Sequence, residues 1–221
     1  MDGNGRWAEK RGRERVFGHK EGVESVRAVM EASVEWGIPY VSFFAFSEEN
    51  WGRPEDEVRT LMELMGRAML AEMDNFMRNG IRFVVLGNRS RLSAELNADI
   101  DKAMAQTAAN PGLTMILFLS YSGRWDILQA AEKVAHDLIE NPGQTLRAED
   151  LQRRLVTAEF PDPDLLIRTS GEKRISNYML WQTAYTEFLF TDTLWPDFRR
   201  EAYLQALEEY ASRDRRFGKI K

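Results

Sequence analysis

The sequence of 221 residues contains no cysteine, which excludes a disulfide framework, a thiolate metal site and a cysteine nucleophile. It contains only two histidines, His19 and His136, so a zinc site would need mostly carboxylate ligands. It also lacks an apolar run long enough to cross a bilayer, and no signal peptide opens it. From these absences we expect a cytoplasmic protein.

The chain is weakly acidic, with 30 basic and 35 acidic side chains and a net charge of −5. This balance argues against a general nucleic-acid binder, so no nucleic-acid partner is expected. The basic residues gather near the two ends, within residues 6–20 and 213–221. Such clusters are commonly solvated surface, but two basic ends on an acidic protein also suit a focused anionic ligand.

Strand-like apolar segments alternate with helix-like segments, and no repeat, linker or low-complexity tract interrupts them. The alternation predicts a single α/β domain over residues 1–221, with a mostly parallel central β-sheet flanked by helices. Helices are expected at 22–36, 54–79, 91–109, 199–213 and from Gly123 onward, and strands at 40–46, 81–86, 113–120, 164–168 and 188–190. Because ligands of such sheets bind beyond the carboxyl ends of the strands, the loops of interest are 47–53, 87–91, 121–125 and 168–176.

The first motif of the chain predicts a tight turn and reads Asp2-Gly3-Asn4-Gly5-Arg6-Trp7. Glycines let the backbone approach a ligand, and adjacent N–H groups can form an anion-binding nest. A carboxylate beside such a nest suits a phosphate bound together with Mg²⁺. Asn-Gly is also a common surface turn, and the motif alone leaves both interpretations open.

Two later loops carry more polar chemistry than a loop needs. The loop Ser47–Pro54 crowds hydroxyl, carboxylate, amide, indole and guanidinium groups, and helix capping would explain only one or two of them. In the loop 168–177, Arg168, Arg174 and Ser176 could clamp a diphosphate, because planar guanidinium groups bind phosphate bidentately. The alternative for Arg168 is a structural ion pair with Asp164 or Glu187.

The common phosphate-binding motifs are missing. The sequence has no G-x-x-x-x-G-K-[ST] segment, no G-x-G-x-x-G after a predicted strand, and no aspartate-rich D-D-x-x-D segment of the kind found in all-helical prenyl synthases. An ordinary P-loop enzyme is therefore disfavoured.

The motifs taken together resemble the cis-prenyltransferase family, and in particular its bacterial undecaprenyl diphosphate synthases. The resemblance covers nearly the whole chain. The matching blocks follow the family order: Asp2 to Ala8, Phe17 to Lys20, Ala45 to Ser47, Glu49 to Trp51 with Arg53-Pro54, Gly123 to Trp125, Asp164-Leu165 with Ile167 to Thr169, Arg174 to Asn177, Glu187, Asp192 and Trp195 to Phe198.

The resemblance implies a transferase that condenses isopentenyl diphosphate onto an allylic diphosphate such as farnesyl diphosphate, with Mg²⁺ as cofactor. The expected product is a long-chain cis-polyprenyl diphosphate, undecaprenyl diphosphate, the lipid carrier for cell-wall synthesis. Asp2 matches the catalytic Mg²⁺ ligand, and Glu187 matches a further metal-binding position. Asn50 matches a catalytic residue of the proton-loss step, where a neutral amide is better suited to orient groups than to act as a base.

Substrate-binding positions also transfer from the resemblance. The allylic diphosphate is assigned to Gly3, Asn4, Gly5, Arg6, Arg15 and His19. The isopentenyl diphosphate is assigned to Arg168, Arg174 and Ser176. The other matching positions are Trp7, Ser47, Glu48, Glu49, Trp51, Arg53, Ile175 and Arg216, and Arg216 belongs to a tail that completes the partner subunit's site in this family.

The family also implies a homodimer, an apolar tunnel for the growing lipid, and peripheral contact with the inner face of the membrane for product release. Small Ala45 would leave space near the tunnel entrance. The expected helix 54–79 supplies an apolar stripe that is either tunnel lining or ordinary core: Leu61, Met62, Met65, Met69, Met73, Phe76 and Met77.

Four departures from the family pattern stand out. Glu48 replaces a usual serine, Ser122 a common glycine, and Lys173 a frequent histidine, which removes Lys173 from the metal set. The family also has an apolar strand before the Asp-Gly-Asn-Gly motif, whereas here that motif begins at residue 2. From this we expect a missing first strand and an Asp2 that is poorly held. Two other functions remain open, a non-catalytic partner subunit and an α/β module that binds phosphate or RNA.

Overall fold

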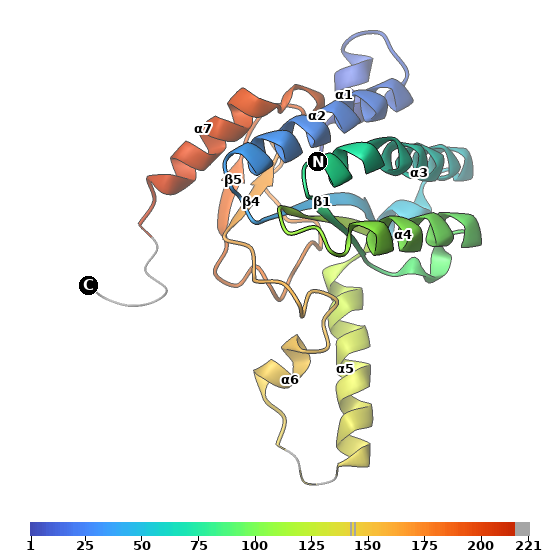
Figure 1. Cartoon of the computed structure of the whole chain (residues 1–221), viewed down its shortest axis with the longest axis vertical. Coiled ribbons are helices and arrows are strands. Elements are labelled where there is room, and N and C mark those ends of the chain that lie inside the picture. The colour runs from blue at the N-terminus through green and yellow to red at the C-terminus, as the bar shows by residue number, and fades with distance from the viewer. Residues whose placement is uncertain (142, 144, 215–221) are drawn as a thin grey trace.

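The computed structural model describes residues 1–141, 143 and 145–214, and all its strands pair in parallel within that part of the chain (Figure 1). Strands β1 (Tyr40–Ser47), β2 (Arg82–Leu86) and β3 (Thr114–Tyr121) form one sheet in the order β1-β3-β2. Strands β4 (Leu165–Arg168) and β5 (Glu187–Phe190) form a second, two-stranded sheet. The predicted α/β fold is confirmed, with its parallel strands divided between two sheets.

Seven α-helices surround these strands in the described residues. They are α1 (Asn4–Glu9), α2 (Arg15–Glu35), α3 (Glu55–Arg78), α4 (Ala94–Thr107), α5 (Gly123–Glu140), α6 (Ala148–Gln152) and α7 (Arg200–Ala211). In Figure 1, α7 lies against β5 and beside α2, α3 and α4 lie side by side with α4 against β2, and α5 extends away from the rest with α6 next to it. No helix in the described ranges is long and apolar enough to span a membrane.

The core fills the space between the sheets and their helices. Strand β3 is buried at nearly every position, as expected of the central strand of a parallel sheet. Its neighbours contribute Phe43 and Phe46 from β1 and Phe83 from β2, and Phe83 stacks on Phe76 of α3. Pro54 is the N-cap residue of helix α3, and the acids of the first turn complement the helix dipole.

Close packing of α1 on α2 sets the position of the N-terminal motif. A Cβ atom added at Gly18 of α2 would lie 1.9 Å from the carbonyl oxygen of Asn4, and one at Gly22 would lie 2.4 Å from the Asn4 side-chain oxygen. These distances are far below van der Waals contact. Only glycine at these two positions therefore allows α1 to lie so close to α2.

Two local predictions are wrong. Residues 2–7 do not form a tight turn, because Gly3 has a left-handed φ of 102° and caps helix α1, which begins at Asn4. Helix α2 begins at Arg15 rather than at residue 22, so the basic residues before 22 lie partly on a helix. The other predicted helices and strands are present with shifts of a few residues at their ends.

Candidate active site

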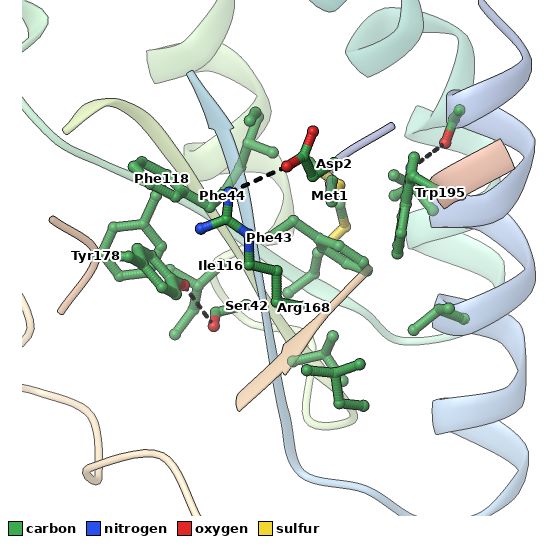
Figure 2. A pocket seen from close by; sticks show the side chains of 18 of the residues that line it. Met1, Asp2, Ser42, Phe43, Phe44, Ile116, Phe118, Arg168, Tyr178 and Trp195 are labelled. Carbon is green, nitrogen blue, oxygen red and sulfur yellow. Dashed lines mark hydrogen bonds and ion pairs between the residues drawn. The ribbon is translucent and has the colours of Figure 1, made fainter. Parts of the chain in front are cut away.

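A pocket of about 770 Å³ lies between the two sheets and is bounded by α2 and α3. Figure 2 shows Asp2 and Arg168 pointing toward each other at its polar end. Below them the wall is aromatic and aliphatic, with Phe43 and Phe44 from β1 and Tyr178 from the loop after β4. The polar end includes Asp2, Arg6, Arg15, His19, Ser47, Asn50, Arg53, Arg168, Arg174 and Ser176.

The main chain of Asp2 is held by residues remote in sequence. Its N–H donates to Oγ1 of Thr169 at 2.9 Å, and the same hydroxyl donates to the Asp2 carbonyl oxygen at 2.8 Å. That carbonyl also accepts the N–H of Trp195 at 3.0 Å. The expectation that Asp2 is poorly held is therefore wrong, because the end of β4 and the Trp195 segment fix its backbone.

The Asp2 carboxylate lies at the centre of a cationic cluster. Its Oδ2 accepts Nη2 of Arg168 at 3.0 Å, and its Oδ1 accepts the Gly3 N–H at 2.7 Å, with Arg6 at 3.5 Å. Burial raises the pKa of Asp2, but hydrogen bonds from Arg168, Ser170 and Gly3 outweigh it and leave the pKa below its usual value. The carboxylate is therefore ionised at neutral pH.

Arg168 connects Asp2 to the loop that follows β4. Its Nη1 donates to the Arg174 carbonyl oxygen and, at 2.6 Å, to Oγ of Ser176. The Nε of Arg168 is buried and has no partner in the described part of the chain. Arg168 pairs with Asp2, a partner that the sequence analysis did not consider.

His19 faces the pocket as a neutral imidazole. Its Nε2 is buried without a hydrogen-bond partner among the described residues. Burial, followed by the charge of Arg53, lowers its pKa from 6.5 to about 4. Nearby, Arg15 pairs with Glu9 at 2.8 Å while its guanidinium lies over Gly5, where an added Cβ would be 2.5 Å from Cζ.

The loop after β1 folds into a 3₁₀ helix, η1 (Glu48–Gly52), and only some of its residues face the pocket. Ser47, Asn50 and Arg53 line the pocket. Oδ1 of Asn50 accepts the Ser47 N–H at 3.1 Å, so the amide presents its NH₂ group elsewhere. The orienting role of Asn50 stays a prediction.

Three other predicted residues of this loop are not among the pocket lining. Glu48 accepts Oγ of Ser120 at 3.1 Å, and Trp51 donates its indole N–H to the same oxygen at 2.9 Å. Glu49 accepts the side-chain amide of Asn177 at 2.6 Å. All three therefore stabilise the loop in this structure.

Three further predicted site residues differ in where they lie. Ile175 lines the pocket together with Arg174 and Ser176. Trp7, in contrast, donates its indole N–H to Asp197 at 2.7 Å and stacks on Phe17. Arg216 lies outside the described residues.

Glu187 is not brought next to Asp2 within this chain. It begins β5 opposite Leu165, whereas Arg168 pairs with Phe190 at the other end of the strand. The carboxylate of Glu187 pairs with Arg213 at 3.0 Å. In the described ranges, no group of three or more histidines, cysteines, aspartates or glutamates is arranged to hold a metal ion. A metal-binding role for Glu187 stays a prediction.

Sequence reasoning missed Thr169, Ser170, Trp195 and Asn177. Oγ of Ser170 accepts a hydrogen bond from Nη2 of Arg6 at 2.6 Å. Thr169 and Trp195 hold the backbone of Asp2 by hydrogen bonds. Thr169, Trp195 and Asn177 lie in blocks that match the family, and Ser170 lies in the polar loop 168–177, but neither signal indicates which contact each residue makes.

Parallel strands, a cationic cluster at their carboxyl ends and a deep apolar pocket beneath it define an enzyme that binds an anionic head group and an apolar chain together. A family model described as putative undecaprenyl diphosphate synthase matches residues 1–218. The chain belongs to this family of prenyltransferases.

Curated relatives and solved structures agree with this assignment. Isoprenyl transferase of Porphyromonas gingivalis is 48% identical and matches 99% of this chain and 87% of its own length. A Vibrio vulnificus protein named ditrans,polycis-undecaprenyl-diphosphate synthase, (2E,6E)-farnesyl-diphosphate specific, is 44% identical over 99% of this chain and 88% of its own. The crystal structure of lavandulyl diphosphate synthase from Lavandula x intermedia in complex with dimethylallyl diphosphate has a TM-score of 0.95 at 34% identity, covering 99% of this chain and 95% of that one.

Proposed function

We propose that this protein is a Mg²⁺-dependent cis-prenyltransferase that extends farnesyl diphosphate with isopentenyl diphosphate to undecaprenyl diphosphate. The observation that carries the proposal is the position of Asp2 and Arg168 at the polar end of a large apolar pocket. The farnesyl-specific relative supports the choice of primer. The retained Asp2, Asn50, Arg168 and Arg174 favour a catalytic chain over a non-catalytic partner subunit.

The residues around Asp2 fit Mg²⁺ bound together with a diphosphate. Mg²⁺ in phosphate-binding enzymes is commonly held by one or two carboxylates, by substrate oxygens and by water, so the single carboxylate of Asp2 suffices. When bound, the ion supplies Lewis-acid stabilisation of the leaving diphosphate. Asp2 would exchange its pairing with Arg168 for the ion, which frees Arg168 to bind phosphate.

The chain's own cations account for the rest of the diphosphate chemistry. Arg6, Arg15 and His19 bind the allylic diphosphate, while Arg168, Arg174 and Ser176 bind that of isopentenyl diphosphate. As the allylic C–O bond breaks, negative charge grows on the leaving diphosphate, and preorganised guanidinium groups stabilise it. The isopentenyl double bond forms the new C–C bond, a proton is then lost to a diphosphate oxygen, and Asn50 orients the reacting groups.

The apolar pocket accounts for repeated addition. Each buried methylene contributes about 0.8 kcal/mol, so one five-carbon unit contributes at most about 4 kcal/mol. This gain favours retention of the growing chain between additions. Of the predicted stripe on α3, Leu61, Met65, Met69 and Phe76 line the pocket, and Ala45 lies on its wall. The other members, Met62, Met73 and Met77, are not part of the lining.

A homodimer is part of the proposal. Helix α5 extends from the molecule and carries an exposed apolar stripe at helical spacing (Figure 1). The stripe consists of Leu128, Ala131, Ala135 and Ile139, of which Leu128 and Ile139 are 61% and 75% exposed. Large exposed aliphatic side chains in a row are typical of an interface. Completion of the partner's site by Arg216, and contact with the cytoplasmic face of the membrane, remain parts of this proposal.

The test combines purified protein with farnesyl diphosphate, labelled isopentenyl diphosphate and Mg²⁺, and sizes the butanol-extractable products by chromatography. We expect labelled polyprenyl lipid that disappears with a chelator. Asp2→Asn should reduce the rate by ~100-fold or more. Asp74→Asn, an exposed position on α3, is the matched control and should retain activity.

A second arm replaces farnesyl diphosphate with dimethylallyl diphosphate, the ligand named for the lavandulyl diphosphate synthase structure. If labelled product forms with dimethylallyl diphosphate and not with farnesyl diphosphate, farnesyl diphosphate is not the primer. Absence of labelled lipid with either primer would leave a non-catalytic subunit or a phosphate-binding module as the function.

A further inference from the structure

Asn177 lies between three segments of the candidate site. Its carbonyl oxygen accepts the Gly123 N–H at 2.7 Å, and its Oδ1 accepts the Arg124 N–H at 3.0 Å, both in the first turn of α5. Its side-chain NH₂ donates to Oε1 of Glu49 in η1 at 2.6 Å. One residue of the loop after β4 is therefore bonded to a helix and to a second loop.

These contacts require an amide at position 177. The oxygen of the amide faces an N–H donor and its nitrogen faces a carboxylate, so the two partners fix which end of the amide points where. An aspartate would still accept from Arg124, but it would place a second carboxylate against Glu49. An alanine would remove both side-chain bonds.

The backbone of the same segment is held in an uncommon conformation. Ser176 and Asn177 have φ angles of 51° and 60°, in the left-handed region that Asn tolerates better than most residues. The segment also packs tightly on α5, because a Cβ atom added at Gly123 would lie 2.7 Å from Cγ of Leu180. The surrounding contacts, rather than local preference, keep this conformation in place.

We call the hydrogen bond between the Asn177 amide and Glu49 the bridge. The residues next to its two ends belong to different parts of the active site. Ser176 precedes Asn177 and accepts Arg168, which in turn pairs with Asp2. Glu49 precedes Asn50, which lines the pocket. The amide of Asn177 therefore connects the segment that carries Arg174 and Ser176 to the segment that carries Asn50.

We propose that Asn177 is a positioning residue that sets the isopentenyl diphosphate segment, residues 174–176, against the η1 loop. This inference rests on the proposed function, because it assigns a step of that reaction to the two segments. A displacement of about 1 Å between reacting groups costs on the order of 100-fold in rate. Loss of the bridge should therefore lower the kcat/KM for isopentenyl diphosphate more than it changes the KM for the allylic substrate.

The experiment reverses the polarity of the bridge. Asn177→Asp should lower kcat/KM for isopentenyl diphosphate by roughly 10- to 100-fold, with the KM for farnesyl diphosphate changed by less than about twofold. In the double variant, Asn177→Asp with Glu49→Gln, the new amide at 49 donates to the new carboxylate at 177. The double variant should then be more active than Asn177→Asp and approach the activity of Glu49→Gln alone. The rescue shows that the hydrogen bond between positions 177 and 49 is what was lost. A purely structural role would lower activity with both substrates together with the melting temperature, and does not predict the selective loss for isopentenyl diphosphate.

Controls separate positioning from folding and from the proposed function. Asn88→Asp is matched, because the side-chain oxygen of Asn88 only accepts, from Ser90, and it should behave as wild type. If Asn177→Asp does not fold, Asn177→Gly keeps access to the left-handed backbone, deletes the amide, and should show the same selective loss. Calorimetric titration of isopentenyl diphosphate compares the variants even if no turnover is seen.

Two results would overturn the proposal. One is wild-type binding and kinetics in Asn177→Asp and Asn177→Gly. The other is a loss of activity in Asn177→Asp that Glu49→Gln does not rescue and that is accompanied by a matching fall in melting temperature. The wild-type protein could also bind isopentenyl diphosphate without turnover, and titration could still show weaker binding in Asn177→Asp and its rescue by Glu49→Gln. That result would count against the proposed function, but it would support the positioning role of Asn177.

Discussion

At the scale of single residues, the site combines an ionised carboxylate with a neutral histidine. Asp2 is held ionised by hydrogen bonds from Arg168, Ser170 and Gly3, which outweigh its burial. His19 is kept neutral by burial and by neighbouring arginines, and its Nε2 lacks a partner among the described residues. In the proposed function the allylic diphosphate supplies the missing partner and favours the protonated imidazole, which would couple ligand binding to proton uptake at His19.

We predict that His19 makes the folded protein less stable in mild acid. The pKa of His19 is about 4 in the folded state and 6.5 as the reference for the unfolded chain. Between these values the unfolded chain binds a proton that the folded chain does not, so stability falls as pH falls from 6.5 toward 4. The decrease is at most about 1.4 kcal/mol per pH unit and levels off below pH 4.

Denaturant unfolding at pH 7 and pH 5 measures this effect. His19→Gln should lose less stability than wild type on the same acid shift, whereas His136→Gln, at an exposed position, should lose as much as wild type. Equal losses in wild type and His19→Gln would contradict a buried neutral imidazole.

At the scale of elements, local signals predicted most of the fold. Helix α3 could be predicted because Pro54 and three acids mark its start and Gly80, with a φ of 62°, follows its end. Strand β3 could be predicted because it is an unbroken apolar run. Helix α1 could not, because two of its first residues are Asn4 and Gly5, which local preference assigns to turns.

The contacts that complete the site are the part that sequence reasoning could not supply. Asp2 is 167 positions from Thr169, and no periodicity or spacing relates two residues so far apart. The same holds for the carbonyl contact of Asp2 with Trp195. The resemblance placed Asp2, Arg168 and Arg174 in one site, but the anchoring of Asp2 depends on tertiary packing.

The packing of α1 on α2 should be more important for activity than for global stability. Gly18→Ala would place a methyl group against the Asn4 carbonyl oxygen, and the backbone of α1 must then move. We expect a cost of about 1–3 kcal/mol, typical of overpacking, and a larger relative loss of activity because α1 carries the motif beside Asp2. Melting temperature and initial rate, measured on the same preparation, test this.

Gly66→Ala on α3 is the matched control, since its Cβ would be 3.4 Å from the Leu96 side chain. It should be neutral or stabilise by up to about 1 kcal/mol, as expected for alanine in a helix. Full activity in Gly18→Ala would show that α1 need not lie so close to α2.

Helix α3 also offers a test of the apolar pocket. Ala68 lines the pocket, so Ala68→Leu should narrow it and shorten the product by one or more five-carbon units. Ala71→Leu changes an exposed position of the same helix and should leave the product length unchanged. Chromatography of the labelled lipids compares the two variants, and identical products from both would argue that the lipid follows another route.

At the scale of the whole molecule, the distribution of charged and apolar surface separates three tasks. Cations gather at the polar end of the pocket, around Asp2 and Arg168. Mostly apolar side chains line the rest of the pocket between the two sheets, and the ion pair of Arg27 with Glu72 lies among them. A second apolar surface, the stripe on α5, lies on the outside, on a helix that extends away from the sheets (Figure 1). Head-group binding, chain binding and the proposed subunit contact therefore fall on different surfaces, so each can be altered by substitution without direct change to the others.

The α5 stripe should determine the oligomeric state. Leu128 and Ile139 lie on the same side of α5, eleven residues or about three turns apart, and both are largely exposed. Arginine at both positions would place two charges in an apolar contact, and burying them unpaired would cost several kcal/mol. Wild type is expected to sediment as a dimer, and the variant Leu128→Arg with Ile139→Arg is expected to sediment as a monomer at the same concentration. Lys133→Glu, on the opposite side of the helix, should remain a dimer, and a dimeric double-arginine variant would place the interface elsewhere.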